Sequence, residues 1–402
     1  MSLSMTSGSH WNSESEIQLT IDQAQQIISA RLAGHDQSIV KSLSHIENKG
    51  YRQVHLDISE IMTFNPRSFT GSYTPGYRTY ILDLDSIGVP GHSSRPCSCF
   101  LIIACQDRAI NESSQTNSLQ VIHQIIGRIR DRTDMPTQNS ILDTSLELVP
   151  FHYLLSPACP IHSSDIVSLS SARQLSLLSP TDAVLIDLQI GKCLGQLHSG
   201  VQNDWYGLPQ LEPPQDPSYS WQETFTLLFE TLLGDLETAR VQLPYKEIRH
   251  YLSRAIGSFL FDDVEVPSLI WFTGSDHDIY VSLPADPSAR VRGVVAILPN
   301  IAHALWGDPL LETFFLPPNP STAMLEGYSE CGGGPLIIFP RQKIKRTWYT
   351  LFLALVVLKQ RAYAINIPAQ ESEVLSAIEV DQAWVTDTIL KSIESLRGAP
   401  IY

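Results

Sequence analysis

The feature of this chain that most constrains its fold is a change in the spacing of its apolar residues. From about Val54 to Ala104 the pattern is that of short strands, because Tyr80, Leu82 and Leu84 alternate and residues 100–104 are a continuous apolar run. Apolar residues later recur at helical spacing over 180–198, 220–240, 244–259, 345–364 and 371–396. A β-rich part followed by a larger helical part predicts an α+β protein with two lobes.

Further elements set the expected boundaries of the two lobes. Helices are expected over 20–31, with Thr20 as N-cap, and over 118–132. A last strand of the first lobe is expected over 146–155, β structure of the second lobe over 268–298, and a long connection rich in proline and glycine over 306–340. We therefore predict a disordered tail at 1–15, an N-lobe with a leading helix at 16–156 and a C-lobe at 157–402, joined by a hinge at Pro157-Ala158-Cys159-Pro160.

Composition and charge narrow the function classes. The chain has 402 residues, which suits a two-lobed fold, and its 43% hydrophobic content is that of a globular protein. A net charge of −15 argues against nucleic acid or an anionic membrane as a general partner. The six cysteines lack a second close pair beside Cys97-x-Cys99, so we expect reduced thiols rather than a zinc site or disulfides.

Two stretches bear on localisation. Residues 1–16 are polar and serine-rich and lack the apolar run of a signal peptide. Residues 348–358 (WYTLFLALVVL) are strongly apolar, yet too short to cross a bilayer and flanked by basic residues, so we expect a buried helix and no stable membrane insertion. The expected location is cytoplasmic.

The glycine run at 332–334 matches no phosphate-binding pattern and is interpreted as a flexible connector.

Several segments carry a family resemblance through their order and spacing. Residues 190–199 (IGKCLGQLHS) with 203–209 (NDWYGLP), 305–312 (LWGDPLLE), 130–136 (RDRTDMP) and 50–55 (GYRQVH) are similar to segments of fungal members of one branch of the kinase-like fold. That branch contains the aminoglycoside phosphotransferases and fructosamine kinases. The resemblance covers about residues 45–365 and implies a protein-kinase-like fold with a small β-rich N-lobe and a larger helical C-lobe.

The resemblance also places this chain's residues at the family's functional positions. A strand–loop–strand of the family carries His-Gly-Asp and, five residues after the Asp, an Asn that holds magnesium. Aligning on the strand at 278–281 puts Trp271 at the His, Phe272 at the Gly, Thr273 at the catalytic Asp and Asp278 at the Asn. By the same resemblance, the phosphate-binding Lys, its partner Glu on the N-lobe helix and the Asp of the second metal-binding motif align with Ile102, with Ile122 or His123, and with Asn300.

These replacements predict that phosphoryl transfer has been lost. The reaction needs a Lys on the phosphates, a Glu pairing that Lys, a catalytic base, and carboxylates on magnesium. A Thr hydroxyl cannot accept a proton from an attacking alcohol near neutral pH, and a lone Asn is a poor magnesium ligand. We therefore expect no nucleotide, no metal and no cofactor.

The cleft between the lobes is the expected site, lined by the 271–278 loop, the 298–303 loop and the first hairpin. Its apolar lining suits a lipophilic metabolite better than a triphosphate. Candidate catalytic residues are Thr273, Asp276, His277, Asn300 and His303, and candidate substrate-binding residues are Ile102, Trp271, Phe272, Asp278, Trp205 and Tyr206. The competing structural interpretation is that Trp271 and Phe272 fill vacated volume, that 276–278 is a solvated turn and that 203–206 packs against the loop.

Three functions remain open. The favoured one is a cofactor-independent cyclase, for example of intramolecular Diels–Alder type, acting on a lipophilic metabolite in fungal secondary metabolism. Such a reaction needs a held conformer and one or two hydrogen bonds rather than a base or metal. The second is a non-catalytic pseudokinase that binds a small molecule or a protein. The third is an ATP-dependent kinase with displaced residues, using Asp276 as base and Asp278 on the metal.

Overall fold

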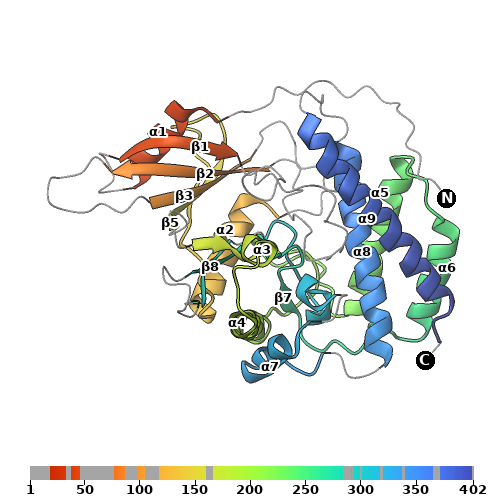
Figure 1. Ribbon diagram of the computed structural model, residues 1–402. Helices are drawn as coiled ribbons and strands as arrows, with labels where there is room; N and C mark the ends of the chain where they lie inside the picture. Colours follow the sequence, from red (N-terminus) through yellow and green to blue (C-terminus); the bar gives the residue numbers. More distant parts are fainter. Residues whose placement is uncertain are drawn as a thin grey trace.

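The computed structural model describes two lobes, a smaller one built on a sheet and a larger one built mostly of helices (Figure 1). It confirms the predicted α+β, two-lobed architecture. The described residues are 19–32, 38–45, 77–86, 97–104, 117–159, 166–283, 291, 293–298, 301–316, 320–336, 340–364 and 372–400. The predicted tail at 1–15 and the strands expected between residues 54 and 76 lie outside them.

The N-lobe contains a five-stranded antiparallel sheet with one helix packed on it. Thr20 caps helix α1 (Ile21–Arg31) as predicted, because its side chain accepts a hydrogen bond from the Gln23 backbone and Gln23 returns one. Ala24, Ile27 and Ile28 are buried against the sheet. The strands follow the order β1 (Ser38–His45), β2 (Tyr77–Ser86), β3 (Cys97–Ala104), β5 (Tyr153–Cys159) and β4 (Ile141–Asp143).

Helix α2 (Leu119–Arg132) packs against both lobes. Ser118 caps its first turn, and its apolar side chains recur every three or four residues, so that one face is buried. That face packs with α4 (Pro180–Gly200) and the strands of the C-lobe in one apolar cluster. Before the helix, the buried Asn117 side chain donates to the carbonyls of Ile301 and Ala304, both at 2.9 Å. The helix start is therefore fixed to the C-lobe.

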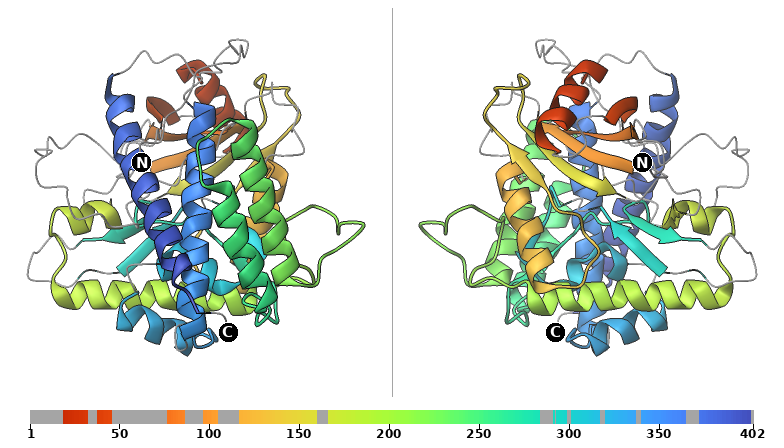
Figure 2. Two further views of the ribbon diagram at one scale, coloured as in Figure 1. Left: turned by 90° about the vertical axis from the view of Figure 1, so that its right-hand side faces the viewer. Right: turned by 90° about the vertical axis from the view of Figure 1, so that its left-hand side faces the viewer.

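The part of the C-lobe nearest the sheet contains short strands around a loop. Strand β7 (Ser268–Ile270) pairs with β10 (Leu305–Gly307), while β6 (Ile166–Ser168), β8 (Ile279–Ser282) and β9 (Gly293–Ile297) form a second small sheet. Helix α4 runs beneath these strands with α7 (Thr322–Glu330) along its underside, as both views of Figure 2 show. The remaining short elements are α3 (Leu169–Gln174), η4 (Pro309–Leu311) and η5 (Thr313–Phe315).

Four long helices form the rest of the C-lobe. They enclose an aromatic core in which Phe225 lies 4.7 Å from Phe261 and 5.1 Å from Tyr349, centroid to centroid. The run at 348–358 is a buried part of α8, as predicted, and within the described residues no helix is long and apolar enough to cross a membrane. The helices are α5 (Trp221–Thr238), α6 (Tyr245–Gly257), α8 (Pro340–Ala364) and α9 (Ser372–Arg397).

Three sequence predictions about elements were inaccurate. Strand β5 begins at Tyr153 rather than near 146, because residues 145–151 bend and Leu146 has a φ of 60°. The stretch 306–340, expected to be a long connection, contains β10, two 3-10 turns and α7. The glycine run ends α7 rather than being a free connector, since the Gly333 N–H donates to the Tyr328 carbonyl at 2.9 Å.

Candidate functional site in the 271–278 loop

The loop between β7 and β8 is anchored to the segment that follows β10. The backbone N–H of Trp271 donates to Oε2 of the fully buried Glu312 at 2.9 Å, and Thr313 Oγ1 donates to the Gly274 carbonyl at 2.5 Å. Inside the loop, the Thr273 N–H donates to the Trp271 carbonyl at 2.8 Å. The loop is therefore a fixed element that can hold side chains in defined positions.

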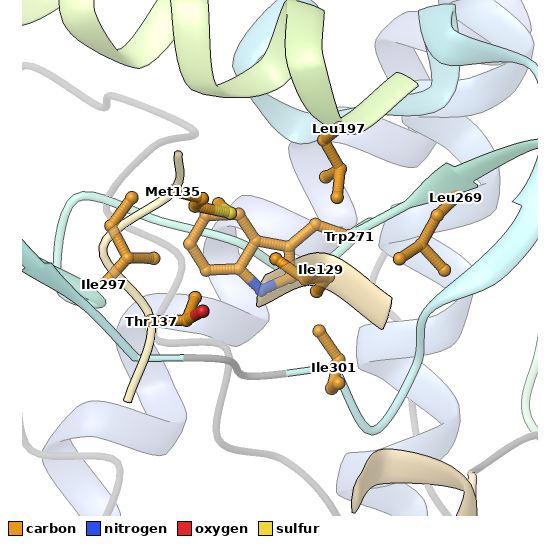
Figure 3. A pocket seen from close by; sticks show the side chains of 8 residues that line it. All are labelled: Ile129, Met135, Thr137, Leu197, Leu269, Trp271, Ile297 and Ile301. Carbon is orange, nitrogen blue, oxygen red and sulfur yellow. The ribbon is translucent and has the colours of Figure 1, made fainter. Parts of the chain in front are cut away.

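Trp271 points into the apolar cluster between α2 and α4 (Figure 3). Its indole is 2% exposed and borders a void of about 10 Å³. Gly274 makes this arrangement possible, because a Cβ there would lie 2.4 Å from Trp271 Cδ2. The void is lined by Ile129, Met135, Thr137, Leu197, Leu269, Trp271, Ile297 and Ile301. This placement agrees with the volume-filling interpretation of Trp271 rather than with a side chain open to ligand.

Phe272 turns the other way, into the core of the long helices. Its ring lies 5.5 Å from that of Phe352, and it belongs to a different apolar cluster from Trp271. Its φ is 63°, a conformation that favours glycine, at the position that the resemblance aligns with a glycine. The backbone strain is tolerated because the buried ring packs in the core. Thr273, at the aligned base position, is buried.

Asp276 and His277 are held by residues of α3, which the sequence did not indicate. Arg173 Nη1 lies 3.2 Å from Asp276 Oδ2, while Arg173 Nη2 donates to Asp187 on α4 at 2.6 Å. The Ser170 N–H donates to the Asp276 carbonyl at 3.1 Å, and the Ser170 hydroxyl lies 3.3 Å from His277 Nε2. Burial lowers the pKa of His277. Asp276 is thus buried in a charge network and is not the solvated turn residue expected.

The side-chain carboxyl group of Asp278 has a strongly raised pKa. Its Oδ2 accepts hydrogen bonds from both the backbone N–H and the hydroxyl of Ser275, each at 2.9 Å. Loss of hydration raises its pKa to about 7, although these two hydrogen bonds act in the opposite direction. The side chain is only partly buried. Near neutral pH the loop therefore presents a carboxyl group that is partly protonated and can donate a hydrogen bond.

Apolar side chains of β3 and α2 stand at positions aligned with the family's Lys and Glu, and they belong to one apolar cluster. Ile102 pairs with Leu154 across the sheet and packs in the same cluster as the buried Ile122. The neighbouring His123 lies 2.8 Å from the Ser140 hydroxyl, through its Nδ1. Among the described residues, no group of three His, Cys, Asp or Glu side chains is arranged to hold a metal ion.

The remaining predicted site residues are dispersed. His303 is buried close after the gap at 299–300, and Asn300 itself lies outside the described residues. Tyr206 packs in the apolar cluster that also contains Phe272, its hydroxyl donates to the Val264 carbonyl at 2.7 Å and its backbone pairs with Ser218. Trp205, next to it, is half-buried. The structure therefore brings together 271–278 with Arg173 and Glu312 through polar contacts, whereas Tyr206 is related to the loop through the apolar cluster of Phe272.

Sequence reasoning missed Ser170, Arg173 and Glu312. Arg173 lies in a six-residue helix, about 100 positions from Asp276, and no motif indicated that pair. Glu312 offered a signal, since it ends the 305–312 segment used for the resemblance, but its role as a hydrogen-bond acceptor for the loop emerged only from the structure.

Comparisons with known proteins support this fold. No protein-family model matches the chain, and no curated protein sequence matches it. A thermostable mutant of aminoglycoside phosphotransferase APH(4)-Ia, in ternary complex with AMP-PNP and hygromycin B, is 13% identical over 94% of this chain and 99% of its own, with a TM-score of 0.51. The GDP complex of a mutant aminoglycoside 2'-phosphotransferase-IIIa is 10% identical over 94% and 100%, with a TM-score of 0.52. The chain therefore has the kinase-like fold of aminoglycoside phosphotransferases.

Proposed function

We propose that this chain is a kinase-fold protein that does not transfer phosphate from ATP. The observation that carries the proposal is the apolar character of Ile102 on β3 and Ile122 on α2, which pack into one large apolar cluster. In phosphoryl transfer a lysine and a glutamate at such positions bind and orient the phosphates. With isoleucines at these positions, no lysine ammonium is present to pair with the negative charge of a triphosphate.

The loop supports the same proposal at the positions aligned with the base and the metal ligand. Thr273 offers a hydroxyl that is buried and no carboxylate. Asp278 is a carboxyl group, but its raised pKa leaves it partly protonated near neutral pH, and a protonated carboxyl is a weak ligand for magnesium. Asp276, the other acid of the loop, lies beside Arg173, whose positive charge competes with a cation.

Ligand binding to the intact protein tests the proposal. Differential scanning fluorimetry with magnesium–AMP-PNP should leave the unfolding temperature unchanged, because a ligand that binds the folded state raises it. A transfer assay with radiolabelled ATP and hygromycin B, the aminoglycoside bound in one of the similar structures, should give no labelled product. Saturable stabilisation by AMP-PNP together with phosphorylated product would instead establish the third function, a kinase with displaced residues.

A second, finer candidate is a cofactor-independent cyclisation of a lipophilic metabolite. Asp278 and His277 favour it, because neighbouring groups with shifted pKa values in one loop are typical of acid–base or hydrogen-bonding sites. A protonated Asp278 would donate a hydrogen bond to a substrate carbonyl as electron density builds up there, while the loop fixes the reacting conformer. A role in fungal secondary metabolism remains a prediction from the resemblance.

A non-catalytic pseudokinase is the alternative to the cyclase, and the burial of Trp271 and Phe272 in two separate cores favours it. Incubation with polyene and terpenoid precursors, followed by product analysis, separates the two. A cyclised product formed by wild type and lost in Asp278→Asn supports the cyclase, because Asn keeps an acceptor for Ser275 but has no acidic proton. No product from either protein above a protein-free control supports the pseudokinase, and equal protein-dependent product from both would show that Asp278 is not the proton donor.

A further inference from the structure

We propose that a second cavity, which we call the α4–α8 cavity, binds a small organic cation that carries primary amines on a methylene chain. The cavity has a volume of about 280 Å³ and lies where the end of α4, the segment before β7 and the start of α8 meet. Its walls come from distant stretches of sequence, 198–202, 263–268, 308–310, 328–336 and 342–345. Its volume is that of a compact small-molecule site rather than of a bound water.

The α4–α8 cavity is separate from the 271–278 loop. Ser268 lines the cavity at one end of β7, and Trp271 follows the other end of the same strand. Three residues of strand place their backbones about 10 Å apart. The loop residues Thr273, Asp276 and Asp278 are not among the lining residues. This binding site would therefore stand even if the proposed function failed.

The net charge of the residues that line the cavity favours a cationic ligand. Asp263, Glu265 and Asp308 contribute three carboxylates, and Lys345 contributes one ammonium group, so the lining has a formal net charge of −2. Lys345 is buried and lies 2.6 Å from Asp263 and 2.5 Å from Asp308. Its charge is already neutralised there, and an anionic ligand would meet an excess of negative charge.

The carboxylates differ in how many hydrogen bonds and ion pairs they already form within the protein. Asp308 is saturated, because it also accepts hydrogen bonds from the Tyr349 hydroxyl at 2.7 Å and the Leu310 N–H at 2.9 Å. Glu265 is exposed and forms no ion pair among the residues that the structure describes. Glu265 is therefore the group we expect to pair with a ligand ammonium, beside Asp263 at the mouth of the cavity.

The wall of the cavity also contains a buried histidine. The His198 side chain is 2% exposed, and its Nδ1 lies 3.0 Å from the Tyr328 hydroxyl. Its Nε2 is buried, lies 3.5 Å from Glu312 Oε2 and makes no hydrogen bond within the described part of the chain. Because Nε2 lies beside Glu312, which does not line the cavity, His198 contributes its buried ring to the wall, and the ammonium groups of the ligand are expected to pair with the carboxylates.

The remaining lining decides between an organic amine and a bare metal ion. A divalent ion needs several converging oxygen or nitrogen ligands, and the described residues contain no such group. Val264, Val266, Leu310 and Leu336 instead give the cavity apolar wall that methylene groups can cover. An alkyl amine satisfies both the charged and the apolar parts of the lining.

Calorimetry with spermidine as probe tests the proposal on the full chain in about 0.15 M salt. Wild type should bind it saturably. Gly334→Trp should weaken binding, because Gly334 lines the cavity and the space around its Cβ leaves room for the indole at the cavity wall. Glu265→Gln should weaken Kd about two- to fivefold, as expected for an exposed ion pair.

Matched controls distinguish binding of spermidine in the cavity from its general electrostatic attraction to an acidic protein. Gly398→Trp adds the same ring at another glycine with no atom within 4 Å, and Glu212→Gln removes an exposed carboxylate outside the cavity. Both should bind spermidine like wild type. Three results would overturn the proposal: no saturable binding to wild type, unchanged binding to Gly334→Trp, or equal weakening by Glu212→Gln and Glu265→Gln.

Discussion

The backbone N–H of Trp271 donates a hydrogen bond to the side chain of Glu312, with 2.9 Å between N and Oε2. The carboxylate is fully buried, and its other oxygen, Oε1, has no hydrogen-bond partner among the described residues. The next residue, Thr313, holds the Gly274 carbonyl. The segment after β10 thus fixes the loop at two points, which defines where Thr273 and Asp278 are presented.

Removal of the Glu312 carboxylate should destabilise the protein. Glu312→Ala leaves the buried Trp271 N–H without an acceptor, and such a loss costs about 1–3 kcal/mol. Glu312→Gln should cost less, because its amide oxygen can still accept the hydrogen bond. Urea unfolding measures both. Glu326→Ala, at an exposed position on α7, is the control and should change stability by less than about 0.5 kcal/mol. Equal effects of the Ala and Gln variants at Glu312 would contradict the assigned hydrogen bond.

Gly274 should tolerate no side chain. Its Cβ would lie 2.4 Å from a rigid ring that is itself packed between α2 and α4, so Gly274→Ala should lower the free energy of unfolding by roughly 1–3 kcal/mol. Gly234 provides the matched control, because it lies in α5 with no atom within 4 Å of its added Cβ. Gly234→Ala should stabilise the protein by about 0.5–1 kcal/mol. The same sign of change in both variants would refute the assigned position of the Trp271 ring.

The sequence predicted the elements better than the site, and the reason is physical. Period and capping signals are local, so α1 with its Thr20 cap, the amphipathic α2 and the buried α8 were all predictable. Helix α7 was missed because proline and glycine surround it and its nine residues show little periodicity. The direction in which Trp271 and Phe272 point depends on one positive φ and one close glycine contact. Neither has a local sequence signal.

The contacts of Asp276 show more clearly what could not be predicted from the sequence. The competing structural interpretation, based on the turn preference of Asp, placed Asp276 in a solvated turn, yet it is buried beside Arg173. Only the packing of α3 against the 271–278 loop brings the two residues together. Long-range ion pairs of this kind cannot be read from residue spacing, whereas the apolar character of Ile102 could be, because it follows from a run within one strand.

Stability should fall with rising pH through the titration of Asp278. Its pKa is raised from 3.8 to about 7 in the folded protein. Between about pH 4 and 7 the unfolded chain loses this proton while the folded protein keeps it, so ionisation favours unfolding in that window. The contribution is at most about 4 kcal/mol. Asp278→Asn should remove it, and the gain over wild type should be larger at pH 8 than at pH 4.

Unfolding by urea at several pH values checks this expectation, with Asp216→Asn as control. Asp216 is exposed in the loop before α5 and should leave the pH profile parallel to that of wild type. A profile for Asp278→Asn that runs parallel to wild type between pH 4 and 8 would show that the carboxyl titrates normally. The cyclase candidate would then lose its proton donor.

Restoring two acids should not restore phosphoryl transfer. In Thr273→Asp with Asn300→Asp, both aligned carboxylates return, but Ile102 still leaves the phosphates without a lysine, and the cluster around it offers no glutamate to orient one. We expect no transfer of radiolabelled phosphate above the wild-type background. Adding Ile102→Lys should lower stability, because it places an unpaired ammonium among apolar side chains. Wild-type unfolding behaviour of the double variant confirms that it is folded, and phosphoryl transfer by it would show that the apolar residues Ile102 and Ile122 do not prevent the reaction.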